Sequence, residues 1–226
     1  MIFDMRRLLL MGIPVIVLGV GLAASFGGGA SAHPHVWVTA RSELVFDGPA
    51  MVSVRHVWQF DEAFTSFAIQ GLDTNEDGAL SREELQPLAK VNVESLQEFD
   101  FFTYVEGGDL QAVFMPSTEY WLDFNNGRLT LFFTLPLKAP ISPAGQGLTV
   151  DIYDPTFFVD FAMVKEDPVI ATNLPESCSL AFELPPEMDS SVSAALAEIP
   201  SSVKDLPPEF AAVTESRANT ATITCK

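Results

Sequence analysis

Residues 73–84 read DTNEDGALSREE, and this stretch decides how the chain around it is interpreted. It matches the calcium-loop pattern D-x-[DN]-x-[DN]-G-x5-E at every specified position. In such a loop the first, third, fifth, seventh, ninth and twelfth residues supply the oxygen ligands, and a glycine allows the sharp turn at the sixth. The corresponding ligands here are Asp73, Asn75, Asp77, the carbonyl of Ala79, Ser81 through a water, and Glu84. The stretch therefore predicts a calcium site, and an acidic turn without metal is the simpler alternative.

The 226 residues contain no second match to this pattern. Calcium sensors usually carry paired loops, whereas a lone loop is more typical of a site that holds two helices at a fixed angle. Extracellular calcium modules need only weak sites, with dissociation constants on the order of 0.1–1 mM. We therefore interpret the loop as structural first and regulatory second.

Apolar residues at helical spacing flank the loop on both sides. Before it, Asp61 is a candidate N-cap for a helix that leads into the loop. After it, Ser81 and Glu84 form an S-x-x-E capping box for a second helix that continues to about residue 102. The sequence thus predicts an EF-hand-like helix–loop–helix insertion at 61–102.

Alternating apolar residues and turn signals predict a β-rich body on either side of this insertion. Residues 36–46 and 51–60 form a predicted hairpin around a turn at 47–50. The later predicted strands are 102–106, 111–115, 120–125, 129–135, 148–153, 157–164, 178–184 and 220–225. We expect 148–153 and 157–164 to pair with each other. The fold class expected is α+β, mostly antiparallel and sandwich-like, with the one insertion.

The first 32 residues have the layout of a secretory signal peptide. Arg6 and Arg7 precede an apolar run at 8–24, and small residues end in the A-x-A site at 30–32. We expect cleavage after Ala32, export, and no membrane span in the mature chain. A retained membrane anchor is the alternative, disfavoured by the glycines and proline within the run. The mature chain then divides into a β-rich body at 33–165 and a C-terminal segment at 166–226.

The chain is strongly acidic, with a formal net charge of −18. Such a charge repels nucleic acid and anionic lipid surfaces and concentrates cations, so no nucleic-acid partner is expected. The two cysteines are Cys178 and Cys225. An even pair in an exported chain most simply forms one disulfide, which would tie the C-terminal segment to the body.

The predicted mature chain begins His33-Pro34-His35, and these histidines are candidate metal ligands. The new amino group and the His33 imidazole can chelate together, and imidazole suits zinc, copper and nickel. The predicted hairpin would bring Asp61 and Glu62 toward His35. The candidate transition-metal cluster is therefore His33, His35, Asp61 and Glu62, and solvated terminal histidines are the alternative. The remaining histidine, His56, is interpreted as a half-buried residue of a strand.

Several landmarks along the mature chain match one bacterial family. They are HPHVW at 33–37, WQFDEAFTSF at 58–67, the loop at 73–84, NVESLQEFDFFTYV at 92–105, YDPTFFVDF at 153–161 and the two late cysteines. On these the chain resembles a periplasmic family of unknown function, described as the periplasmic component of an uncharacterised ABC-type transport system. Its members tend to accompany zinc or nickel/cobalt transport genes. The resemblance implies a periplasmic location and an inner-membrane metal transporter as partner.

Three functions follow from these observations. The first is a periplasmic calcium-binding accessory, or metal-binding component, of a divalent transition-metal transport system that handles zinc or nickel. The second is a protein-interaction scaffold that is held together by calcium and has no transition-metal site. The third and weakest is a copper oxidase with an N-terminal histidine brace at His33. Hydrolase motifs are absent and three histidines leave little for acid–base chemistry, so we do not expect an enzyme.

Overall fold

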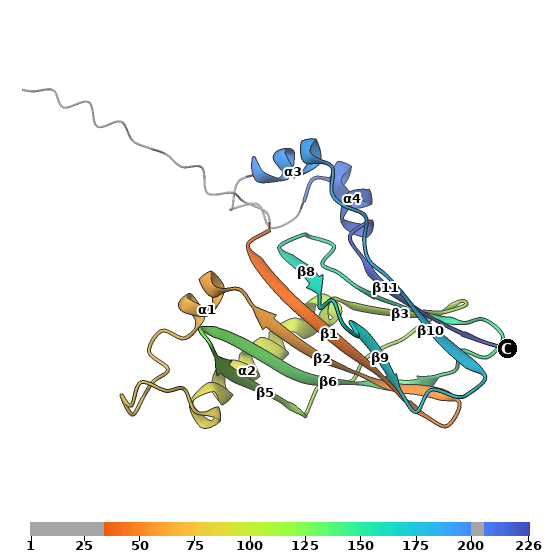
Figure 1. Cartoon of the computed structure of the whole chain (residues 1–226), viewed down its shortest axis with the longest axis horizontal. Helices are drawn as coiled ribbons and strands as arrows, with labels where there is room; N and C mark the ends of the chain where they lie inside the picture. The colour runs from red at the N-terminus through yellow and green to blue at the C-terminus, as the bar shows by residue number, and fades with distance from the viewer. Residues whose placement is uncertain (1–33, 200–205) are drawn as a thin grey trace, which may run out of the picture.

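The computed structural model describes residues 34–199 and 206–226. The predicted signal peptide and His33 lie outside the described residues. The described chain forms two β-sheets, mostly antiparallel, with few helices (Figure 1). The α+β class expected from the sequence is therefore confirmed.

The first sheet is built around the long hairpin that the alternation predicts. Its order is β5 (Tyr120–Asn125), β6 (Arg128–Ile141), β2 (Ala50–Phe60), β1 (Val36–Asp47) and β8 (Val159–Met163), and β9 (Val169–Thr172) also pairs with β1. β8 and β9 both run parallel to β1, whereas the other pairs are antiparallel. The β5–β6 turn has positive φ at Asn126 and Gly127, as a two-residue Asn-Gly hairpin requires.

The second sheet has the order β10 (Cys178–Glu183), β11 (Asn219–Cys225), β7 (Leu148–Ile152), β3 (Thr103–Gly107) and β4 (Leu110–Gln111). The expected pairing of 148–153 with 157–164 is wrong, because β7 belongs to this sheet and β8 to the first. Between them Asp154 accepts the N–H groups of Thr156 and Val159, and Phe157 has a φ of +53°. The aspartate thus organises a crossover between the sheets, where the sequence alone indicated a hairpin turn.

The helices lie outside the two sheets. α1 (Glu62–Ala68) and α2 (Arg82–Leu96) flank the loop, and the 3-10 helix η1 (Gln97–Phe102) continues from α2. Near the C-terminus lie α3 (Ser190–Ala197), the 3-10 turn η2 (Pro208–Phe210) and α4 (Ala211–Glu215). α2 continues through Pro87 and is anchored to β5 by a bidentate bond from Arg82 to Asp123. None of the helices in the described part of the chain is long and apolar enough to cross a membrane.

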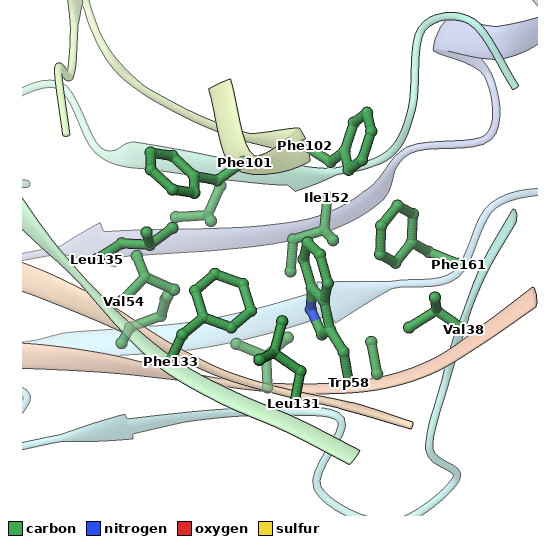
Figure 2. Packing of buried hydrophobic residues seen from close by; sticks show 14 of the residues in the cluster. Val38, Val54, Trp58, Phe101, Phe102, Leu131, Phe133, Leu135, Ile152 and Phe161 are labelled. Atoms are coloured by element: carbon green, nitrogen blue, oxygen red, sulfur yellow. The ribbon is translucent and has the colours of Figure 1, made fainter. Parts of the chain in front are cut away.

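One hydrophobic core fills the space between the sheets. Trp58, Leu131 and Phe133 of the first sheet face Ile152 of the second (Figure 2). The Trp58 ring meets Phe133 edge-on at 4.7 Å between centroids. Aromatic pairs in this geometry add about 0.5–1.5 kcal/mol beyond the area they bury. The alternation of the strands is therefore explained by one inward face on each sheet.

His56 lies inside this core, with only 1% of its surface exposed. Thr103 Oγ1 donates to the Phe101 carbonyl, so it accepts from His56 Nε2, and Ser42 Oγ then donates to Nδ1 at 2.8 Å. This hydrogen-bond pattern assigns the neutral Nε2–H tautomer. Burial lowers the pKa of His56 to about 3. His56 therefore joins the two sheets as a neutral core residue.

Candidate metal centre

The predicted calcium loop leaves α1 at Ile69, its C-cap, and enters α2 at Ser81, its N-cap. Within it the Asp73 carboxylate accepts the N–H groups of Asp77 at 3.1 Å and of Gly78 at 2.9 Å. The Asn75 carbonyl oxygen accepts the N–H of Asp77 at 3.0 Å. Asp77 Oδ1 in turn accepts the N–H of Ala79 at 2.8 Å, so the side chains of three predicted ligand residues fold against the backbone of their own loop.

Glu84, the last predicted ligand, closes the loop. Its Oε1 accepts the N–H and the hydroxyl of Thr74, and its Oε2 accepts the N–H and the hydroxyl of Ser81. The Ser81 hydroxyl also accepts the N–H of Glu84, which completes the predicted capping box. The hydrogen bonds from Ser81, followed by those from Thr74, lower the pKa of the Glu84 carboxyl to about 2. The carboxylate is thus ionised and fixed beside the start of the loop.

Gly78 occupies the turn for which the pattern demands glycine. Its φ is +80°, and a Cβ built there would meet no atom within 4 Å. The requirement is therefore one of backbone conformation, which glycine adopts without the steric cost of a side chain. Glu76 also has positive φ, at 58°. The sharp reversal of the chain is built as the sequence pattern predicts.

The donor set suits calcium, a hard cation that takes six to eight oxygen ligands. Within the described ranges no three His, Cys, Asp or Glu side chains converge closely enough to hold an ion. Asp73, Asp77 and Glu84 bond instead to N–H and hydroxyl groups of the loop and of its Ser81 cap. Each carboxylate oxygen of Asp73 and Asp77 accepts one hydrogen bond and retains a second lone pair, whereas each oxygen of Glu84 already accepts two. Calcium binding at this loop requires the carboxylates to turn toward one centre, and it remains a prediction.

The residues of the predicted transition-metal cluster are only partly brought together. The hairpin places Asp61 beside Trp37, whose N–H donates to Asp61 Oδ2 at 2.9 Å. Asp61 Oδ1 accepts the N–H of Phe64 as the expected N-cap, and Glu62 pairs with Arg128 at 3.2 Å. The His35 ring packs on Phe158 at 4.7 Å between centroids. Asp61 and Glu62 thus have structural partners, and a metal at this cluster stays a prediction.

The disulfide expected from the sequence is present between Cys178 and Cys225. The two cysteines are register partners at the ends of β10 and β11. The segment after residue 165 contributes β9 to the first sheet and β10 and β11 to the second. The disulfide therefore locks the outer strand pair of the second sheet.

The fold and the loop together define a two-sheet α+β protein with a candidate calcium site on a helix–loop–helix segment. The chain belongs to the family DUF1007, described as a protein family of unknown function, whose model matches residues 18–225. An uncharacterised protein of Haemophilus influenzae is 21% identical over 188 residues, which cover 82% of this chain and 88% of that protein. An uncharacterised 15.5 kDa protein from the trpE 3′ region of Spirochaeta aurantia is 31% identical over 97 residues, which cover 43% of this chain and 69% of that protein.

Proposed function

We propose that this protein is an exported calcium-binding module in which an EF-hand-like segment fixes α1 and α2 against the first sheet. The observation that carries the proposal is the closure of the loop by Glu84, which reaches Thr74 at 2.9 Å. This contact ties the carboxylate of loop position 12, the position of the bidentate calcium ligand, to loop position 2, which follows Asp73 in the chain.

Calcium at this loop would neutralise repulsion among clustered carboxylates on a chain of net charge −18. α1 is held to β6 by the hydroxyl of Thr65, which accepts the N–H of Leu129, and α2 is held to β5 by Arg82. Each helix thus has its own anchor on the first sheet, and the ion would join the two helices to each other. The role is structural, and the protein would present its surfaces to a partner at the cell envelope.

A second candidate function is the accessory role in zinc or nickel transport beside an inner-membrane transporter. One observation favours it: the β1–β2 register brings Asp61 to Trp37, two residues from His35. Titrating the purified protein with zinc and nickel tests this function. Micromolar binding that is lost in His35→Ala supports it, and flat titrations of the wild type contradict it.

Thermal unfolding with and without calcium tests the proposed module. A ligand at ten times its dissociation constant stabilises the folded state by about 1.4 kcal/mol, or roughly 3–5 °C for a chain of this size. We expect this shift at about 10 mM calcium, given a site of about 1 mM. Glu84→Gln should lose the shift. Glu83→Gln is the matched control, since Glu83 lies in the same helical turn and should keep it. No shift in the wild type, or the same shift in Glu84→Gln, would contradict the proposal.

A further inference from the structure

A largely apolar cavity of about 490 Å³ opens between the first sheet and the helices that flank the loop. Its walls come from segments far apart in sequence and include Val38, Trp58, Phe60, Phe64, Leu96 and Phe99. Protein interiors are close-packed, with few voids larger than a water molecule. Small-molecule sites are apolar cavities of about 300–1,000 Å³ with a few polar groups at defined positions. The cavity therefore has the size and lining of a ligand site.

The mouth of the cavity exposes large aromatic side chains. Phe99 is 47% exposed and Phe158 is 42% exposed, and both line the cavity. The Phe102 ring stacks on Phe99 at 5.5 Å between centroids. Phe102 also lies 5.7 Å from Phe161 in the core (Figure 2), so the aromatic lining continues from Phe99 into the core. An apolar group that enters at Phe99 would thus be surrounded by aromatic faces.

Backbone strain lies in one wall of this cavity. Asp100, Phe101 and Phe102 have φ values of 49°, 53° and 49°, three consecutive non-glycine residues in the left-handed region. Such residues cost on the order of 1–3 kcal/mol each and persist only where the surroundings fix them, often at ligand clamps. Burial of Phe101 and Phe102 fixes them here. The strained turn orients Phe102 toward the cavity and Phe101 toward the core.

The polar groups at the cavity define the kind of head group that fits. Among the residues that the structure describes, no lysine, arginine or histidine lines it. The side chains of Asp154 and Thr156 lie in its lining, and Thr156 Oγ1 already donates to Asp154. Asn92 also lines the cavity; its Nδ2 donates to the Leu88 carbonyl, and its Oδ1 can act only as an acceptor. The lining is therefore rich in acceptors and carries negative charge, which disfavours an anionic head group.

We propose that this cavity binds a small amphiphile with an apolar body and a hydrogen-bond-donating head group such as an amine. The apolar body lies against Trp58, Phe60 and Phe99. The head group stays at the rim, where Asn92 and Thr156 accept its hydrogen bonds. The cavity is lined by other residues than the calcium loop, and the proposal stands whether or not that loop binds calcium.

Fluorescence titration of the purified protein with the neutral probe N-phenyl-1-naphthylamine tests the proposal. Dodecylammonium and dodecanoate, which share one chain length and differ in head group, serve as competitors below their micelle concentrations. Ser95→Trp places a large side chain at an exposed position that lines the cavity. Glu94→Trp is the matched control, because Glu94 is the exposed neighbour of Ser95 on α2 and does not line the cavity. Circular dichroism checks that both variants fold.

We expect the wild type and Glu94→Trp to bind the probe alike, and Ser95→Trp to bind it at least tenfold more weakly. Dodecylammonium should displace the probe at a concentration at least tenfold lower than dodecanoate does. The proposal is overturned if the wild type does not bind the probe, or if Ser95→Trp binds it as Glu94→Trp does. Equal displacement by the two competitors would overturn the assignment of the head group.

Discussion

The carboxylate of Glu84 accepts hydrogen bonds from the backbone N–H and the hydroxyl of Thr74, both at 2.9 Å. The twelfth residue of the loop is thereby tied to the second, ten positions earlier in the chain. The same carboxylate caps α2 through Ser81. One side chain therefore fixes both the closure of the loop and the start of the helix that follows it.

The titration of Glu84 reports this closure. Its pKa in the folded protein is about 2, below the ordinary value of 4.5, because Ser81 and then Thr74 donate to the ionised form. A lowered folded pKa contributes stability above pH 4.5, and that contribution is lost as the pH falls from 4.5 toward 2. Carbon-detected NMR of the side-chain carboxyl should give a midpoint near 2 without calcium. Ser81→Ala should raise the midpoint, whereas a wild-type midpoint near 4.5 would show that the loop is open.

Burial of His56 makes stability depend on pH in a different range. Its folded pKa is about 3, against an unfolded value of 6.5. The unfolded state gains a proton first, so stability is lost as the pH falls from 6.5 toward 3, by about 1.4 kcal/mol per pH unit. Urea unfolding between pH 4 and 8 measures this slope. The difference in the free energy of unfolding between the wild type and His56→Gln should shrink at that rate as the pH falls below 6.5. If the two proteins instead give parallel curves of stability against pH, the burial of a neutral histidine is contradicted.

The Cys178–Cys225 disulfide closes a loop with a sequence separation of 47 residues. A cross-link of this span removes denatured-state entropy worth about 4 kcal/mol, and typical measured values are about 2–4 kcal/mol. We expect the double variant Cys178→Ser/Cys225→Ser to lose that amount in urea unfolding. Ser179→Ala is the control, because it removes only the neighbouring exposed bond to Thr224. A loss below about 1 kcal/mol would show that β10 is held by its hydrogen bonds alone.

Calcium should affect the apolar cavity, because α1 supplies Phe64 and α2 supplies Leu96 to its wall. This prediction rests on both proposals, the calcium loop and the amphiphile site. Coupling between two sites typically changes affinity about 5–150-fold. We expect saturating calcium to tighten binding of N-phenyl-1-naphthylamine at least fivefold in the wild type and to leave it unchanged in Glu84→Gln. Equal probe affinity with and without calcium in the wild type would show that the two sites are independent.

Local signals in the sequence predict much of the fold. The alternation at 36–46 and 51–60 yields β1 and β2, and Asp61 and Ser81 cap the two helices as their side-chain chemistry indicates. Each of these features depends on residues close together in the chain. The disulfide follows from the count of cysteines alone.

Relationships across the chain are harder to predict. β8 and β9 pair in parallel with β1, which lies far from them in the sequence. Neither strand has a sequence pattern that predicts which strand it pairs with. The turn signal at Asp154 indicates a hairpin, although its hydrogen bonds hold a crossover between sheets. The cavity has no local signal, because its wall combines Val38, Phe64 and Phe99 from separate elements. Taken one at a time, the aromatic residues of the cavity cannot be distinguished in the sequence from ordinary core residues.

The amide resonance of Gly78 during a calcium titration tests the proposed calcium site most directly. The Gly78 N–H donates to Asp73 at 2.9 Å, so an ion that draws on that carboxylate must change this hydrogen bond. We expect a large, saturable shift of the Gly78 amide, with the other shifts confined to residues 73–84 and the adjoining ends of α1 and α2. Magnesium at the same concentration should cause a smaller change. If the Gly78 amide does not move at 10 mM calcium, or if the shifts lie elsewhere, residues 73–84 are an acidic turn and not a calcium site.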